Sequence, residues 1–372
     1  MNQRLHKLRQ RMAEVDLQGF LVGSPVEDTF KTYGANRWYL SGFTGSVGWL
    51  LITAEDAYIA VDFRYFERAE RESPEFTLFR SSGGMDTWFA PLLAEAGLAG
   101  KRVGFEPAGV TVAAYQAMKK AIESFPASER PKLLAAPSLV EELRAIKEPQ
   151  ELEALQRAVD LGDETFLHVA RRLEPGWTEE QVAWEIERRA REQGAEAMSF
   201  NTIVASGEWG AMPHATPRDR PIEEGEPIVI DMGVRYKGYC SDLTRTIVLG
   251  KPDDRFKQIY DIVLAAQLTA EELVQTGMTG EEAHKLAHNV ISEAGYGDYF
   301  GHGLGHGVGL LIHEAPRLAL TSRDGLKEGM VVTIEPGIYI PGWGGVRIED
   351  MVVLEDGKAR VMTRAPKLEF AG

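Results

Sequence analysis

Residues 227–242, PIVIDMGVRYKGYCSD, place two carboxyl groups, Asp231 and Asp242, eleven positions apart. An apolar run rich in β-branched residues precedes the first acid, and Gly233 and Gly238 lie between the two acids, so the pattern predicts a β-hairpin. A carboxyl group at the end of a buried strand must have its charge compensated, or its pKa rises until the group is neutral. A bound metal ion is one way to hold two acids there.

The same pattern occurs a second time in the chain. Residues 224–233, EGEPIVIDMG, are echoed by residues 328–337, EGMVVTIEPG, and upstream GWTEE at 176–180 is echoed by GMTGE at 277–281. The two offsets are nearly equal, at about one hundred residues, which indicates an internal duplication. Two similar halves predict a site on a pseudo-twofold axis between them.

The chain in front of this duplication has a different organisation. Up to residue 147, short β-rich runs, residues 38–43 among them, alternate with helical patterns, which predicts a smaller α/β domain. The segment 145–149 is charged and contains a proline, so we expect a domain boundary there. The predicted domains are residues 1–147 and residues 148–372, the second of α+β class.

Charge and composition exclude several kinds of partner. The net charge of −15 argues against nucleic acid, because phosphate binding needs clustered Lys and Arg. The only cysteine, Cys240, excludes an intrachain disulfide and fits a reducing compartment; we interpret it as a small buried hydrophobe, with a thiolate ligand as the alternative. No run approaches the ~18 apolar residues of a membrane helix, and the first residues lack an apolar signal core. We therefore expect a cytoplasmic protein without a membrane partner.

A glycine-rich run, GHGLGHG at 301–307, carries two histidines. Each interior glycine would cost up to ~1 kcal/mol in a helix, so we expect an extended segment with His302 and His306 on one face. The alternative, a phosphate-binding glycine loop, is weaker because neither a dinucleotide fingerprint nor a P-loop lysine is present. His214 and His313 each lie ahead of an acid-bearing strand, and alone either would more often be structural.

The second acidic segment supplies Glu335 and, fourteen positions later, Glu349. Taken singly, each acid would more often be a surface or salt-bridged residue, but the joint placement at duplicated strand ends favours a metal site. Four carboxylates with one imidazole suit divalent ions, Mn²⁺ ahead of Zn²⁺. Because four carboxylates carry too much charge for one ion, we expect two ions ~3.5 to 4 Å apart, bridged by some of the acids.

These residues together resemble the pita-bread metallopeptidases, the family related to creatinase and methionine aminopeptidase. The resemblance rests on Pro213-His214, Asp231, Asp242-Leu243-Thr244-Arg245-Thr246, the run from His302 through His313-Glu314, Glu335-Pro336-Gly337 and Arg347-Ile348-Glu349. Within the family the chain is similar to the proline-specific branch, Xaa-Pro aminopeptidases and Xaa-Pro dipeptidases (prolidases), and Ser41-Gly42-Phe43-Thr44-Gly45 is similar to the aminopeptidase members. This implies a creatinase-type N-terminal domain in front of a pita-bread fold with pseudo-twofold duplication.

The resemblance also implies a ligand set for two metal ions. Asp231 would bind one ion, and His306 and Glu335 would bind the other. Asp242 and Glu349 would bridge both ions. A hydroxide shared by the ions would then attack the carbonyl carbon of the Xaa-Pro bond.

Further roles follow from the same resemblance. Glu335 would pass a proton to the leaving proline nitrogen. His214 and His313 would stabilise the tetrahedral oxyanion or hold the substrate. His302 and Arg347 would face the proline side of the substrate, where an arginine suits a carboxylate or carbonyl; for His302 a structural role is the alternative.

We therefore predict a metal-dependent aminopeptidase that removes an N-terminal residue preceding proline. Its cofactors would be two divalent ions, Mn²⁺ first, with Zn²⁺ or Co²⁺ as alternatives, and we expect a homodimer or a larger homo-oligomer. The alternative within the class is an Xaa-Pro dipeptidase, which shares the metal centre. A pita-bread protein with a different substrate, or one that is a binding module, is the alternative from another class.

Overall fold

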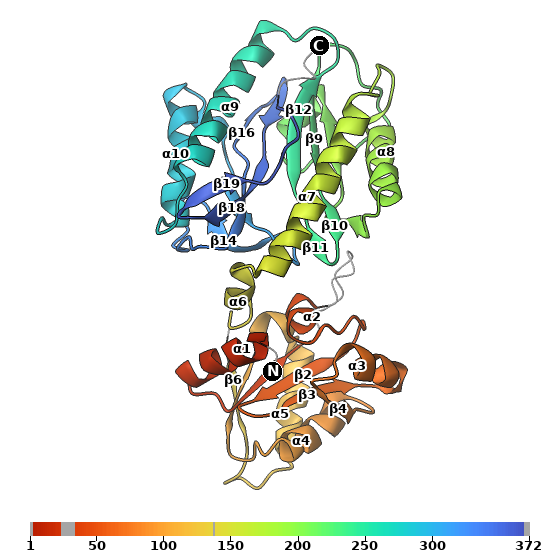
Figure 1. Cartoon of the computed structure of the whole chain (residues 1–372), viewed down its shortest axis with the longest axis vertical. Coiled ribbons are helices and arrows are strands. Elements are labelled where there is room, and N and C mark those ends of the chain that lie inside the picture. Colours follow the sequence, from red (N-terminus) through yellow and green to blue (C-terminus); the bar gives the residue numbers. More distant parts are fainter. Residues whose placement is uncertain (1–2, 24–33, 137, 368–372) are drawn as a thin grey trace. The chain divides into compact units, whose positions relative to one another are not determined.

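The computed structural model describes residues 3–23, 34–136 and 138–367. The chain divides into two compact units, Met1–Arg144 and Ala145–Gly372 (Figure 1). None of the helices within the described ranges is long and apolar enough to cross a membrane.

The first unit is an α/β domain, as predicted. Its elements are α1 (Gln3–Glu14), β1 (Gly19–Val22), α2 (Ala35–Ser41), β2 (Trp49–Thr53), β3 (Ala57–Val61), α3 (Phe66–Glu72), β4 (Thr77–Arg80), α4 (Met85–Glu95), β5 (Arg102–Phe105), α5 (Val112–Ile122), β6 (Lys132–Ala135) and α6 (Glu141–Ala145), whose last residue begins the second unit. One sheet, in the order β4-β3-β2-β1-β5-β6, holds all six strands. Strand β1 is antiparallel to β2 and parallel to β5. Residues of α4 and α5 pack on it in a shared core.

The strand expected at residues 38–43 is wrong, because residues 38–41 belong to helix α2. Aromatic residues suggested a strand. The helix ends at Gly42, whose left-handed backbone (φ 73°) places its N–H within hydrogen-bond distance of the Trp38 carbonyl. Arg37 and Leu40, three positions apart, are both buried, as a helical face requires.

The second unit contains the predicted duplication. Its elements are α7 (Pro149–Ala170), α8 (Glu179–Glu192), β7 (Ala197–Met198), β8 (Ile203–Ser206), β9 (Pro227–Met232), β10 (Val234–Tyr236), β11 (Tyr239–Cys240), β12 (Leu243–Val248), α9 (Asp254–Leu273), α10 (Gly280–Glu293), β13 (Gly305–Gly307), β14 (Glu314–Leu318), β15 (Val331–Ile334), β16 (Gly337–Ile340), β17 (Gly344–Arg347), β18 (Asp350–Glu355) and β19 (Lys358–Val361). Each half runs as two helices followed by antiparallel strands. The helices α8 and α10 begin with the same device, a capping box at Thr178 and at Thr279.

The strands of the two halves also correspond. In the first half β9 lies between β8 and β12, and in the second half β15 lies between β13 and β18. The first predicted hairpin is present, with β9 paired to β12 and its tip closed by β10 and β11. Lys237 and Gly238 both have positive φ values, 48° and 81°, which matches the tight turn that two-residue hairpins favour.

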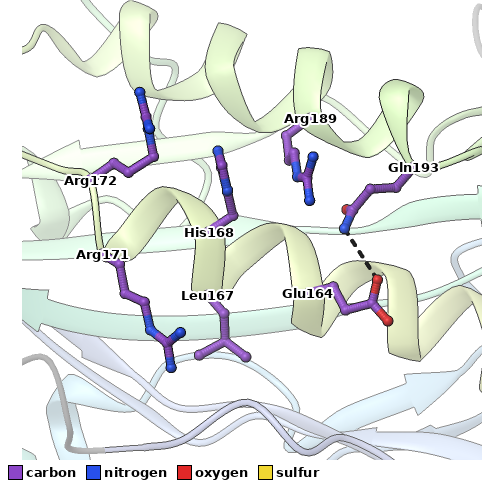
Figure 2. A pocket seen from close by; sticks show the side chains of 7 residues that line it. All are labelled: Glu164, Leu167, His168, Arg171, Arg172, Arg189 and Gln193. Atoms are coloured by element: carbon purple, nitrogen blue, oxygen red, sulfur yellow. Dashed lines mark hydrogen bonds between the residues drawn. The ribbon is translucent and has the colours of Figure 1, made fainter.

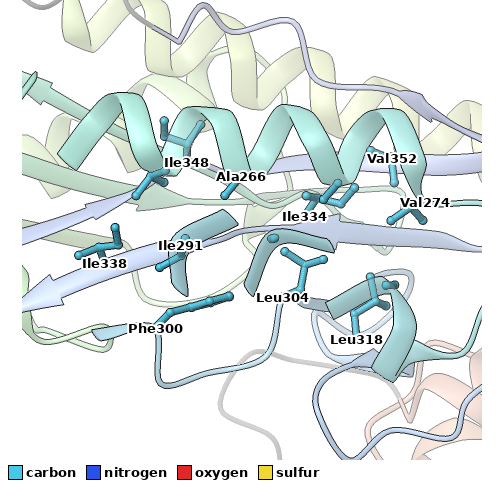
Figure 3. Packing of buried hydrophobic residues seen from close by; sticks show 14 of the residues in the cluster. Ala266, Val274, Ile291, Phe300, Leu304, Leu318, Ile334, Ile338, Ile348 and Val352 are labelled. Carbon is cyan, nitrogen blue, oxygen red and sulfur yellow. The ribbon is translucent and has the colours of Figure 1, made fainter. Parts of the chain in front are cut away.

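Each half has a hydrophobic core between its helices and its strands. In the first half, side chains of α7 and α8 such as Phe166 and Ile186 pack against β9 and β12. In the second half, Ala266 of α9 and Ile291 of α10 share one cluster with Ile334 of β15 (Figure 3). Each fully buried side chain of this kind contributes about 1.5–3 kcal/mol, so the strands that carry the acids are firmly anchored.

Candidate metal centre

The four predicted acids all lie at strand ends. Asp231 lies near the end of β9 and Asp242 directly precedes β12, while Glu335 directly follows β15 and Glu349 directly precedes β18. The backbones of the two halves meet at Thr244, whose carbonyl accepts a hydrogen bond from the Glu349 N–H at 3.1 Å. The acids of both halves therefore converge on one place.

Four of the five predicted ligands are in direct contact range. Asp242, His306 and Glu349 offer ligand atoms that all lie within 4.8 Å of one another. His306 Nε2 is 3.6 Å from an Asp242 oxygen and 3.3 Å from a Glu335 oxygen. The fifth, Asp231, is outside that group of three, and its Oδ2 is 2.5 Å from Arg347 Nη2. Its charge nevertheless acts on the pKa of both Asp242 and Glu349.

The electrostatics show a surplus of negative charge. Burial, and then the neighbouring carboxylates, raise the pKa of Asp242 and of Glu349 well above the usual range. Burial also acts to raise the pKa of Glu335, but its hydrogen bond to His306 and the charges around it outweigh burial and bring the pKa to about 2. The group as a whole is stable only when protons or cations balance its acids.

The residues fit divalent metal ions. Asp231 Oδ1 and Glu349 Oε1 are buried, and neither has a hydrogen-bond partner among the described residues. A buried carboxylate oxygen without a donor is costly, and a cation supplies what it lacks. The set is rich in oxygen with one imidazole, which is the chemistry of Mn²⁺ and related ions.

The glycine-rich run is extended over Gly305–Gly307, where β13 carries His306. A side chain at Gly305 would lie 2.0 Å from the Thr333 carbonyl oxygen, and one at Gly307 would lie 2.2 Å from the Ala315 carbonyl oxygen. Only glycine therefore lets β13 approach its neighbours on both sides. This close packing sets the position of His306 against the acids.

A chain of hydrogen bonds joins His302 to the acids. Tyr339 Oη is 2.9 Å from His302 Nε2 and accepts a hydrogen bond from Arg347 Nη1 at 2.8 Å. Arg347 in turn holds Asp231. Burial raises the pKa of Tyr339 to about 12 and lowers the pKa of His302, so burial favours the neutral form of both groups.

The two remaining histidines of the predicted site, His214 and His313, have exposed side chains. The ring of His313 meets the ring of His306 edge to face, with centroids 4.4 Å apart. His214 is close enough for its charge to act on the pKa of His302 and of His313. Neither side chain is fixed by burial, so both are accessible to a substrate.

Sequence reasoning gave no role to two residues of the site, Thr244 and Tyr339. Thr244 Oγ1 donates to Glu349 Oε2 at 2.6 Å and accepts from Arg347 Nε at 3.1 Å. Tyr339 follows Gly337 on the same face of β16, and Gly337 is paired with Arg347. The available signal in the sequence was the polar hydroxyl of Tyr339 on an otherwise apolar strand that closely follows Glu335.

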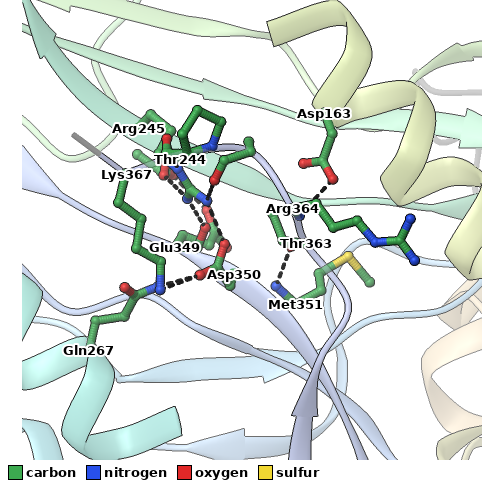
Figure 4. A network of polar contacts seen from close by, with 12 residues as sticks. Asp163, Thr244, Arg245, Gln267, Glu349, Asp350, Met351, Thr363, Arg364 and Lys367 are labelled. Atoms are coloured by element: carbon green, nitrogen blue, oxygen red, sulfur yellow. Dashed lines mark hydrogen bonds and ion pairs between the residues drawn. The ribbon is translucent and has the colours of Figure 1, made fainter. Parts of the chain in front are cut away.

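A buried polar network contacts the backbone of Glu349 (Figure 4). Arg245 forms an ion pair with Asp350 at 2.7 Å, and both side chains are 1% exposed. Arg245 Nη1 also donates to the Glu349 carbonyl at 2.6 Å. Gln267 and Lys367 each place a nitrogen 2.8 Å from the other Asp350 oxygen. The network therefore fixes the backbone position from which the Glu349 side chain extends.

Comparison with known proteins defines the class. Residues 153–356 match metallopeptidase family M24, and residues 4–146 match the creatinase/prolidase N-terminal domain. The chain belongs to the M24 metallopeptidases, and it is a metallo-exopeptidase with the pita-bread fold. The family resemblance and the fold class predicted from the sequence are confirmed.

Several relatives match over almost the whole chain. An Xaa-Pro dipeptidase of Pyrococcus furiosus is 36% identical over 99% of both chains. A solved Xaa-Pro dipeptidase from Bacillus anthracis is 40% identical, with a TM-score of 0.90 over 98% of both chains. A solved X-Pro aminopeptidase from Thermotoga maritima is 32% identical, with a TM-score of 0.88 over 99% of both chains.

Proposed function

We propose that this chain is a dinuclear-metal-dependent aminopeptidase that hydrolyses the bond between an N-terminal residue and proline. The observation that carries the proposal is the convergence of Asp242, Glu349, Glu335 and His306 where the two halves join, with two buried carboxylate oxygens that have no donor among the described residues. The names of three similar proteins, two Xaa-Pro dipeptidases and one X-Pro aminopeptidase, support the choice of proline.

Five side chains would hold the two ions. They are Asp231, Asp242, His306, Glu335 and Glu349. Four carboxylate charges match the charge of two divalent cations, and oxygen donors favour Mn²⁺ over softer ions. When bound, the ions supply Lewis-acid polarisation of the substrate carbonyl and a lowered pKa for water.

The chain's own residues would do the rest. Glu335, kept ionised by its surroundings, can take up the proton released in the attack and pass it to the proline nitrogen, which must be protonated to leave. His313 and His214, both exposed beside the acids, can donate to the oxyanion that develops on the carbonyl. Arg347, held in place by Tyr339, and His302 would receive the proline side of the substrate.

An Xaa-Pro dipeptidase is the second candidate, and the names of two relatives, one 36% and one 40% identical, favour it. A peptide-length series with the Mn²⁺-loaded protein separates the two. We expect cleavage of Xaa-Pro-Yaa-Yaa after the first residue and no cleavage of Xaa-Ala-Yaa-Yaa. Turnover of Xaa-Pro alone would make the protein a dipeptidase. Bound metal without cleavage of any peptide would refute both peptidase proposals.

We also propose a cytoplasmic homodimer or larger homo-oligomer. The thiol of Cys240 is buried and free, which is compatible with a reducing compartment. Light scattering on the metal-loaded protein measures the oligomer directly, and a monomer mass at micromolar concentration would contradict this part of the proposal.

A further inference from the structure

An open groove between α7 and α8 gathers positive charge in an otherwise acidic protein. Its volume is about 510 Å³, and it shares no residue with the proposed metal centre. Figure 2 shows His168 on α7, Arg172 in the turn that follows α7, and Arg189 on α8, with their side chains extending into the space between the two helices. The polar residues that line the groove are Glu164, His168, Arg171, Arg172, Arg189 and Gln193.

The three arginines of the groove lack the partners that their neighbours have. On α8, Arg188 lies 2.6 Å from Glu185 and Arg191 lies 2.9 Å from Glu187. Within the ranges that the structure describes, Arg171, Arg172 and Arg189 have no carboxylate oxygen within 4 Å.

Arg189 adds a more specific observation. Its Nε is buried and has no hydrogen-bond partner in the described part of the chain, although the rest of the side chain is only half-buried. An unpaired buried donor costs about 1–3 kcal/mol. A ligand in the groove would instead reach the terminal Nη nitrogens of Arg189, which have no carboxylate oxygen within 4 Å in the described ranges.

Helix ends explain only part of this cluster. The C-terminal end of α7 favours a cation, and His168, Arg171 and Arg172 lie there. Bringing Arg189 from a second helix toward them adds a further like charge, which is unfavourable. Glu185 of α8 balances part of this charge, because its Oε1 lies 3.8 Å from His168 Nε2, but Glu185 is shared with Arg188 at 2.6 Å. Glu164 is occupied, because its Oε2 accepts a hydrogen bond from Gln193 at 3.1 Å.

We propose that the groove binds a small anion of the phosphate class, with Arg172 and Arg189 as its main ligands. A guanidinium matches two phosphate oxygens at once, and arginines from two elements of one groove can bind different oxygens of a multiply charged anion. The volume lies within the range of small-molecule sites. A long polyanion would be repelled by the net charge of −15, so a small ligand is favoured over a nucleic acid or an acidic protein.

Isothermal titration of the Mn²⁺-loaded protein with inorganic phosphate and with pyrophosphate tests the proposal. Unbound metal is first removed, and metal content is measured before and after, because pyrophosphate chelates Mn²⁺. We expect pyrophosphate to bind more tightly than phosphate. Arg172→Gln and Arg189→Gln should each weaken pyrophosphate binding at least about tenfold, and Arg172→Lys should lose less because it keeps the charge.

Two control variants locate the anion. Arg191→Gln removes a neighbouring arginine of α8 that is already paired, and it should leave binding unchanged. Asp242→Ala disrupts the proposed metal centre and should also leave binding in the groove intact. No measurable binding, an equal loss in Arg191→Gln, or abolition by Asp242→Ala would each overturn the proposal. Tighter binding of polyglutamate or duplex DNA than of pyrophosphate would overturn the assignment to a small anion.

Discussion

Replacing Thr244 by valine should weaken metal binding although the residue is not itself a proposed ligand. Thr244 is fully buried, and its hydroxyl donates to Glu349 at 2.6 Å while accepting from Arg347 at 3.1 Å. Valine keeps the shape and the strand preference but removes both bonds. A hydrogen bond to a charged group contributes about 1.5–3 kcal/mol, which corresponds to a loss of roughly 10- to 100-fold in metal affinity.

Thr246→Val provides a closely matched control. Thr246 lies two residues further along β12 and is 1% exposed, but among the described residues its hydroxyl bonds only to the backbone of Arg347, at 2.9 and 3.0 Å. We expect this variant to lose about 1–3 kcal/mol of stability and to keep its metal affinity within about twofold.

Calorimetric titration of both metal-free variants with Mn²⁺, together with urea unfolding, measures the two quantities separately. If Thr244→Val bound Mn²⁺ as tightly as the unaltered protein, Glu349 would not depend on this hydroxyl. If both variants lost affinity equally, general loosening of β12 would explain the effect, and the reasoning from Thr244 would be refuted.

Three further predictions concern other residues. Asp242→Ala should remove at least one metal equivalent and abolish peptidase activity, because its carboxylate lies within 4.8 Å of ligand atoms of both His306 and Glu349, which suits a bridging acid; full metal content by elemental analysis would contradict this. His214→Ala should keep both metal equivalents and lower kcat roughly 10²-fold, the usual effect of losing one donor to an oxyanion; an unchanged kcat would remove His214 from the mechanism. Burial, followed by the charge of Glu141, raises the pKa of Glu106 in the first unit from 4.5 to about 8. The folded state therefore binds this proton more tightly than the unfolded state, so stability should fall as pH rises from about 4.5 to about 8, by up to about 1.4 kcal/mol per unit. Glu106→Gln should flatten that slope in urea unfolding at pH 5 to 8, and identical slopes would show that Glu106 does not cause it.

The duplication was predictable because it appears as a repeated local sequence pattern. The same turn, apolar run and acid occur in both halves, and each run forms a central strand, β9 and β15, with its acid at the corresponding end. Secondary structure was less certain where composition misled. The aromatic residues of 38–43 favoured a strand, although Gly42 ends a helix there.

The partners of the acids were not predictable, because they depend on how the two halves meet. Thr244 and Glu349 are 105 residues apart in sequence, and nothing local to either residue indicates that they bond. The groove has the same origin, since Arg172 and Arg189 line one groove only after α7 and α8 pack side by side. An arginine without a carboxylate partner can be recognised only in the folded structure, where the positions of the neighbouring carboxylates are known.

The two halves supply equivalent strands but unlike partners for their acids, and this difference shapes the site. If the two halves were exactly symmetric, the four carboxylates would lie together without a positively charged side chain of the protein beside them. Instead Arg347, from the second half, holds Asp231 of the first half, whereas Glu335 is held by His306 of its own half. Arg347 keeps its charge at any ordinary pH and pairs with one Asp231 oxygen, which leaves the other oxygen to bind a metal ion. His306 can lose its proton and become a ligand itself. The two cation positions that we propose are therefore chemically unlike, one bordered by a permanent positive charge and the other supplied with an imidazole nitrogen.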